Sequence, residues 1–123
     1  MIETPENKQN QPRSGHEPAI LLPGVITALL GLMLAVHIAR VFTLNESGDL
    51  NLMTWLAFWP IRFIAGDYTP GGWLPLLWTP FTHVFLHADW SHLLLNGAWL
   101  AIFGTPVARR YGTWRTLALF FVS

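Results

Sequence analysis

Residues 82–96 read THVFLHADWSHLLLN and place three histidines and an asparagine at the start of an apolar segment. That segment, WSHLLLNGAWLAIFGTPVA, covers residues 90–108 and would reach about 28 Å as an α-helix, just enough to cross the hydrocarbon core of a bilayer. Asp89, directly before it, is a good N-cap residue. We therefore predict a membrane helix over residues 90–108. His92 and Asn96 lie near its entrance, where polar side chains are costly and need a role.

A second apolar segment, AILLPGVITALLGLMLAVHIARVF, covers residues 19–42. It has no charged residue before Arg40, and about 21 helical residues span about 32 Å, so we predict the first membrane helix here. Pro23 stands close to its start, where a missing N–H group costs least. At the other end the long side chain of Arg40 can reach the lipid headgroups. His37, one turn inside, is predicted to contact another helix.

The connection between these helices, residues 43–89, is rich in aromatic residues and is interrupted by prolines and glycines. Its stretch LMTWLAFWPIRFIAG carries Arg62 and is shorter than the ~20 residues of a membrane helix. Amphipathic aromatic side chains are favoured where a membrane meets water. We therefore predict short helices and turns lying in the interfacial zone. A packed subdomain outside the membrane is the alternative.

The second helix is followed by a basic turn, ARRYGTWR, that contains Gly112. The apolar residues after it predict the start of a third membrane helix over residues 114–123. This helix would stop after about ten residues, well short of a span. The sequence therefore has the pattern of a chain truncated in the middle of a helix.

The distribution of basic residues predicts the orientation in the membrane. The turn after the second helix carries Arg109, Arg110 and Arg115 without an acidic residue, and short basic turns favour the cytoplasmic side. We predict that residues 1–18, a polar and flexible tail, are cytoplasmic too, and that residues 43–89 face outward. The protein is then a multi-pass integral membrane protein, of a bacterial-type plasma membrane.

Composition supports an all-α membrane protein. Only 11% of the 123 residues are charged and 52% are hydrophobic, whereas soluble domains carry roughly a quarter charged residues. Mean hydropathy is +0.38. A formal net charge of zero argues against a nucleic-acid partner. The absence of cysteine excludes disulfides and thiolate metal sites.

The polar residues of the opening stretch have more than one interpretation. His92 and Asn96 are four residues apart, so on a helix they share one face. Two such donors could stabilise a developing oxyanion, but spacing alone favours hydrogen bonds to a neighbouring helix. His83 and His87 have the same spacing and could join His92 in a zinc site. No H-E-x-x-H motif is present, so histidines that bond to the backbone are favoured, and no metal or cofactor is expected.

Residues 81–115, FTHVFLHADWSHLLLNGAWLAIFGTPVARRYGTWR, resemble the second-helix region of the rhomboid family of intramembrane serine proteases. The family pattern is F-x-H-x-x-x-H-x-x-x-x-H-x-x-x-N, followed by a glycine, a basic turn and another glycine. The resemblance extends over about residues 52–115. The matching residues are Phe81, His83, His87, His92, Asn96, Gly104, Arg110 and Gly112.

The resemblance implies a rhomboid-like helical bundle and a proteolytic function. Residues 19–123 would be a partial rhomboid domain with two full transmembrane helices, a long interfacial first loop and the start of a third helix. By the same resemblance His92 and Asn96 are the oxyanion-stabilising residues, and His83 and His87 are structural. The implied partners are the lipid bilayer, transmembrane protein substrates and the remaining helices of the domain, with no nucleic acid.

The sequence departs from the family pattern at three points. Trp78 is followed by Thr79 where the family often has Trp-Arg, and Ala108 stands where a glutamate often precedes the basic turn. The family's nucleophile, a serine in G-x-S-G, and its base histidine match no position. The serines are Ser14, Ser47, Ser91 and Ser123. The chain is therefore predicted to be the amino-terminal portion of such a protease. A non-catalytic rhomboid-like protein that binds transmembrane helices is the alternative, and a metal-transporter fragment is a weaker one.

Overall fold

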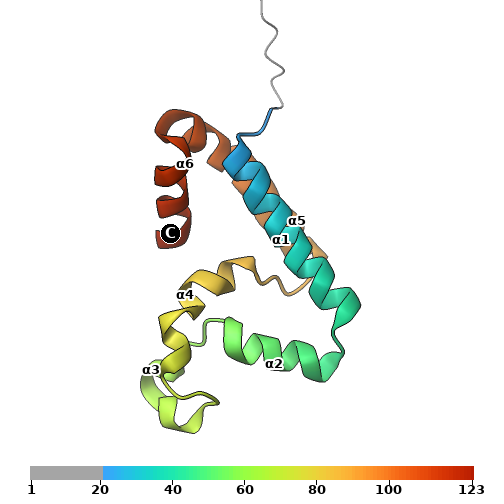
Figure 1. Cartoon of the computed structure of the whole chain (residues 1–123), viewed down its shortest axis with the longest axis vertical. Coiled ribbons are helices and arrows are strands. Elements are labelled where there is room, and N and C mark those ends of the chain that lie inside the picture. Colours follow the sequence, from blue (N-terminus) through green and yellow to red (C-terminus); the bar gives the residue numbers. More distant parts are fainter. Residues whose placement is uncertain (1–20) are drawn as a thin grey trace, which may run out of the picture.

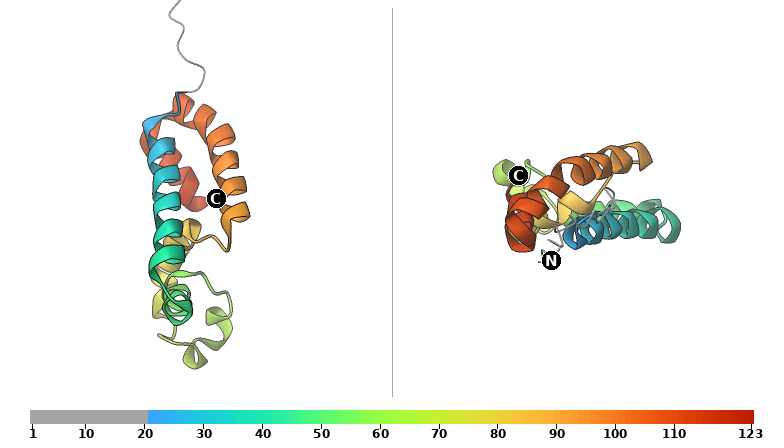
Figure 2. Two further views of the ribbon diagram at one scale, coloured as in Figure 1. Left: turned by 90° about the vertical axis from the view of Figure 1, so that its right-hand side faces the viewer. Right: turned by 90° about the horizontal axis from the view of Figure 1, so that it is seen from above.

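The computed structural model describes residues 21–123, so the predictions for residues 1–18 lie outside the described part of the chain. The described residues form helices and turns without a β-strand, as the all-α prediction requires. Two long helical segments lie side by side, and the connection between them gathers at one end (Figure 1). The last helical segment folds back beside the long pair (Figure 2).

The first long helix, α1, covers Gly24–Thr43. It begins later than residue 19 because Pro23 is extended (φ −54°, ψ 145°) and only its carbonyl joins the helix, accepting from the N–H groups of Ile26 and Thr27 at 3.0 Å. Among residues 21–123, α1 is the one helix long and apolar enough to cross a membrane, with a mean hydropathy of 2.1. Its buried residues follow helical spacing along one face: Ile26, Leu29, Met33, His37 and Arg40.

The second long segment is built from three consecutive helical elements: α5 Trp90–Trp99, the π-helical turn η4 Leu100–Gly104, and the part of α6 Thr105–Val122 that precedes Gly112. Asp89 caps α5 by accepting the backbone N–H of His92 at 2.8 Å, which confirms the predicted N-cap. The π turn ends two residues before Pro106, whose missing N–H and bulky ring disturb a regular α-helix.

Helical backbone continues past residue 108, where the sequence predicted an end. The chain turns instead at Gly112, whose φ of 80° and ψ of 176° interrupt α6. Residues with a side chain rarely adopt this conformation. The residues after Gly112 form the returning helix that ends at Val122.

Gly104 allows the two long segments to approach each other. A Cβ atom at this position would lie 2.8 Å from Cδ1 of Ile26 in α1 and 3.0 Å from Cδ1 of Leu100. Gly97, two turns earlier, faces Leu30 of α1 at an ordinary contact distance. Small residues thus line the side of the second segment that packs against α1.

The connection is a series of short helices. They are α2 Glu46–Leu56, α3 Arg62–Ala65, η1 Gly66–Tyr68, η2 Leu74–Leu77, α4 Thr79–Thr82 and η3 His83–Phe85. The last carbonyls of a helix have no partner inside it, and side chains from three later parts of the connection bind those of α2. The bonds are Arg62 Nη2 to Thr54 O (2.6 Å), Trp78 Nε1 to Trp55 O (2.8 Å) and Thr82 Oγ1 to Leu56 O (2.7 Å).

Candidate functional site

A cavity of about 680 Å³ lies between the connection and the two long segments. His83 and His87 line it from the connection, and His92 and Asn96 line it from α5. Four side chains singled out from the sequence therefore face one hollow. The remaining walls are apolar apart from Ser123 and come from α1, the connection, η4 and the end of α6: Met33, Pro80, Val84, Leu86, Leu100, Phe120, Phe121 and Val122.

His92 and Asn96 are one helical turn apart on α5, and both are exposed in the described chain. Neither side chain makes a hydrogen bond with another residue between 21 and 123; the polar atom of His92 that is engaged is its backbone N–H, at the Asp89 cap. The imidazole and the carboxamide are therefore available as hydrogen-bond donors toward the cavity.

His83 and His87 are held by backbone carbonyls of their own segment. His83 Nδ1 lies 2.9 Å from the carbonyl of Thr79, and His87 Nδ1 lies 3.3 Å from that of Phe85. A carbonyl can only accept, so each Nδ1 donates and each Nε2 is left for other contacts. The ring of His87, 1% exposed, meets His92 edge to face with 5.2 Å between centroids. His87 therefore joins the connection to α5 at the cavity.

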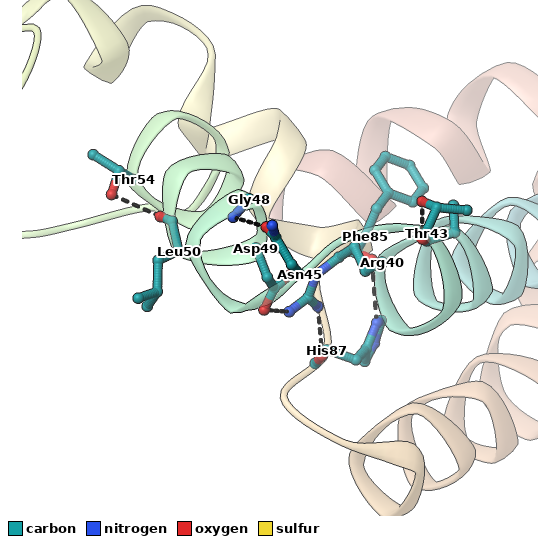
Figure 3. Close-up of polar contacts among 10 residues, drawn as sticks. Arg40, Thr43, Asn45, Gly48, Asp49, Leu50, Thr54, Phe85 and His87 are labelled. Carbon is teal, nitrogen blue, oxygen red and sulfur yellow. Dashed lines mark hydrogen bonds and ion pairs between the residues drawn. The ribbon is translucent and has the colours of Figure 1, made fainter.

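Arg40 holds the segment that carries His87 (Figure 3). Its Nε and Nη2 donate to the Asp49 carboxylate at 2.7 and 3.0 Å, and its Nη1 donates to the His87 carbonyl at 2.7 Å. The sequence had placed this side chain among the lipid headgroups. That prediction was wrong, because the guanidinium is satisfied inside the protein and Arg40 is only 7% exposed. It links α1, α2 and the segment that carries His87.

The Arg40 hydrogen bond lowers the pKa of Asp49 below its usual 3.8. The pair is therefore ionised above about pH 4, and its contribution to stability is lost as the pH falls through the lowered pKa. We expect Asp49→Asn to destabilise the fold by about 2 kcal/mol, because it leaves the guanidinium of Arg40 buried without its counter-charge. Thermal unfolding in detergent at pH 7 measures this. Glu46→Gln, one turn earlier on an exposed position, is the matched control and should change the melting temperature little.

Burial lowers the pKa of His87. The unfolded chain, with a histidine pKa near 6.5, then binds a proton more readily than the folded one, so the contribution of His87 to stability is fully present above pH 6.5 and is lost as the pH falls toward its lowered pKa. We expect a loss of up to about 1.4 kcal/mol per pH unit below that point. Melting temperatures of wild type and His87→Gln between pH 8 and 5 isolate this group. Parallel pH curves for the two proteins would contradict the assignment.

His37 makes the helix contact that the sequence predicted. It is 2% exposed, and its ring meets Trp90 at the start of α5 edge to face with 4.6 Å between centroids. This contact holds the C-terminal part of α1 against the start of α5. Among residues 21–123 no three histidine or carboxylate side chains come together in a metal-binding arrangement.

Sequence comparisons match the chain to rhomboid proteins. Residues 75–123 match the family model of the Rhomboid domain. The chain is 32% identical over 96 residues to a rhomboid protease GlpG of Yersinia pestis, covering 78% of this chain and 30% of the relative. It is 34% identical over 91 residues to a rhomboid protease GlpG of Pectobacterium atrosepticum, covering 74% and 29%. No solved structure matches the chain.

The described residues form a helical protein in which histidines and an asparagine line a cavity beside a long apolar helix. The chain is similar to proteins of the rhomboid family, and residues 75–123 match the Rhomboid domain. It spans about 30% of the length of the curated relatives that it matches.

Proposed function

We propose that the chain is the amino-terminal portion of a rhomboid-type intramembrane serine protease, a serine-type endopeptidase that cleaves transmembrane substrates. The observation that carries the proposal is the cavity, because His83, His87, His92 and Asn96 meet there although they come from two separate elements. The names of the matched relatives and the match to the rhomboid model over residues 75–123 support the same activity.

In this proposal His92 and Asn96 stabilise the oxyanion. A serine would attack the substrate carbonyl, a histidine would act as general base, and negative charge would develop on the carbonyl oxygen. Donors on consecutive turns of α5 that face the cavity suit that charge, since their side chains are available to donate to it. Because neither the nucleophile nor the base matches a position among these 123 residues, both are assigned to sequence outside them.

His83 and His87 have a structural role in the proposal. Each bonds a backbone carbonyl through Nδ1, and His87 also lies at the junction of α1, α2 and α5. They keep the wall of the cavity in place while the donors on α5 act on substrate.

We further propose that α1 and the segment from α5 to Gly112 cross the membrane. Residues 90–111 are helical throughout and reach about 33 Å at 1.5 Å per residue. The short basic turn around Gly112 would lie in the cytoplasm, as would residues 1–18, and residues 43–89 would face outward.

The orientation can be tested with single cysteines, since the chain has none of its own. We expect Ser47→Cys to react with a membrane-impermeant maleimide added outside intact cells, and Thr113→Cys to react only after the cells are opened. The reason is the arginine bias of the turn around Gly112. Labelling of Thr113→Cys, but not of Ser47→Cys, from outside would reject the orientation.

The alternative function is that of a non-catalytic rhomboid-like protein that binds transmembrane helices. The gene decides cheaply between the two. A coding sequence that continues into G-x-S-G, followed by a helix bearing a histidine, supports the protease. A continuation through further apolar helices without these residues supports the binder.

A further inference from the structure

Arg62 is a buried cation at the centre of the connection. The side chain is 0% exposed and begins the short helix α3. Its guanidinium donates to three backbone carbonyls: Nη1 to Pro70 (2.6 Å) and Gly72 (3.0 Å), and Nη2 to Thr54 (2.6 Å). These carbonyls belong to the last turns of α2 and to the turn that follows η1. One side chain thus joins parts of the connection that are far apart in sequence.

The charge of Arg62 is compensated by neutral groups: the three carbonyls and the hydroxyl of Thr69, which accepts from Nη1 at 3.5 Å. Among residues 21–123 no carboxylate forms an ion pair with it, and the ring of Trp59 lies over it with 6.0 Å between Cζ and the ring centroid. Removing a guanidinium from water is expensive, and hydrogen bonds from a charged donor to carbonyls offset that cost. Because these hydrogen bonds are needed to keep the guanidinium buried, they fix the position of the Arg62 side chain. They also fix the backbone segments whose carbonyls accept them.

Two routes lead from Arg62 to the cavity. The first passes through α2, where Arg62 holds the carbonyl of Thr54, while Thr82, the neighbour of His83, holds that of Leu56. The second is a chain of rings.

In this second route the ring of Phe63, the residue next to Arg62, contacts the ring of Phe58, with 6.0 Å between centroids. The ring of Phe58 in turn contacts the ring of His83, with 5.7 Å between centroids. Both routes end at the wall of the cavity formed by α4 and η3. Displacing Arg62 should therefore move the ring of His83.

We propose that Arg62 is a positioning residue for this wall of the cavity. Its planar fork holds the end of α2 and the turn at Gly72 in one arrangement, and this arrangement sets where His83 lies. Lysine keeps the charge but offers a single ammonium, which cannot reach three carbonyls in different directions. The geometry of the guanidinium, rather than its charge, is the property that matters.

The test uses the whole 123-residue chain in detergent micelles with ¹³Cε1-labelled histidine. Arg62→Lys and Arg62→Met are compared with wild type and with Arg115→Lys, an exposed arginine on α6. We expect the His83 ring signal to shift by more than its line width in both Arg62 variants. The His37 signal, from the far side of the α1–α5 contact, should stay in place. Arg115→Lys should leave both signals unchanged.

Chemical rescue separates positioning from general loosening. In Arg62→Ala, guanidinium at tens of millimolar should return the His83 signal toward its wild-type position, and ammonium at the same concentration should not. An unmoved His83 signal in folded Arg62→Lys overturns the proposal. Equal broadening of all histidine signals in Arg62→Lys, with no selective effect of guanidinium on Arg62→Ala, also overturns it.

The consequence for turnover rests on the proposed function. In a chimeric active protease, Arg62→Lys should lower kcat/KM about tenfold, and guanidinium should restore it in Arg62→Ala. A shifted His83 signal in a chimeric protein that cleaves nothing would support the positioning role and count against the protease. An unchanged His83 signal in an active chimeric protein that carries Arg62→Lys would contradict the positioning role and support the protease.

Discussion

Replacing Asn96 by alanine should lower kcat by about 10²–10³-fold in an active rhomboid protease that carries this chain's cavity, which is the usual cost of losing one oxyanion donor. The carboxamide makes no hydrogen bond with another residue between 21 and 123 and faces the cavity, so its loss removes little from the folded state. Because the lost interaction belongs to the transition state, kcat and kcat/KM should fall together while KM changes little.

Two further variants give the control for Asn96→Ala. His92→Ala should be at least as severe in kcat, since its imidazole shares the same wall. His83→Ala should lower the melting temperature as well, because it removes the bond to the Thr79 carbonyl and the contact with Phe58. Turnover and melting temperature are measured on the same purified proteins. An Asn96→Ala protein that melts much earlier but keeps its kcat would show that the side chain only joins helices.

Gly71→Ala should destabilise the connection by about 2–5 kcal/mol. The φ of Gly71 is +77°, which costs about 1–2 kcal/mol for a residue with a side chain. A Cβ atom there would also lie 2.6 Å from the ring of Trp55. A rigid ring cannot move aside as a flexible side chain can, and such overpacking costs about 1–3 kcal/mol. The near-ultraviolet circular dichroism of the tryptophans, followed during heating in detergent, measures the effect.

Neighbouring glycines offer matched controls. Gly72 has a φ of +60° but no side-chain atom within 4 Å of a Cβ position, so Gly72→Ala should show the backbone cost alone. Gly31 lies inside α1 with open space around it, so Gly31→Ala should leave the connection intact. Equal losses in the Gly71 and Gly72 variants would mean that Trp55 does not pack on this turn.

Local sequence signals predicted much of the fold. Asp89 marked the start of α5, because capping needs only one side chain and the next three residues. The apolar run before Arg40 predicted α1, although Pro23 moved its beginning to Gly24. The end of the second long segment was misplaced, because residues 109–111 are polar but helical, and the backbone turns only at Gly112.

Contacts between distant residues could not be read from the sequence. Arg40 looked like a residue for the headgroups, but its partners are Asp49, in the next helix, and the carbonyl of His87, 47 residues away. Arg62 gave no signal beyond its presence in an apolar stretch. Every residue has a backbone carbonyl, so the type of the accepting residue does not show that it accepts a hydrogen bond. The hydrogen-bond partners of the two guanidinium groups could therefore not be predicted from the sequence.

The candidate site was predicted through spacing and resemblance together. The i, i+4 spacing placed His92 and Asn96 on one face of a helix. Two residues that only form hydrogen bonds to a neighbouring helix would have the same spacing, so spacing alone does not assign the oxyanion role. The resemblance to the rhomboid pattern assigned them the oxyanion role, and their meeting with His83 in one cavity supports that role. What spacing could not supply was the path of the connection that brings His83 to the cavity.

The central claim is that this cavity carries the oxyanion side of a rhomboid protease. The most direct measurement uses a chimeric Yersinia pestis rhomboid protease in which the aligned region of this chain replaces its counterpart. The chimeric protein, inserted in membranes, is assayed for cleavage of a transmembrane substrate of the parent enzyme. We predict cleavage that a serine-directed inhibitor abolishes and that Asn96→Ala reduces at least 100-fold. A folded, inserted chimeric protein that does not cut a substrate its parent cuts would contradict the claim.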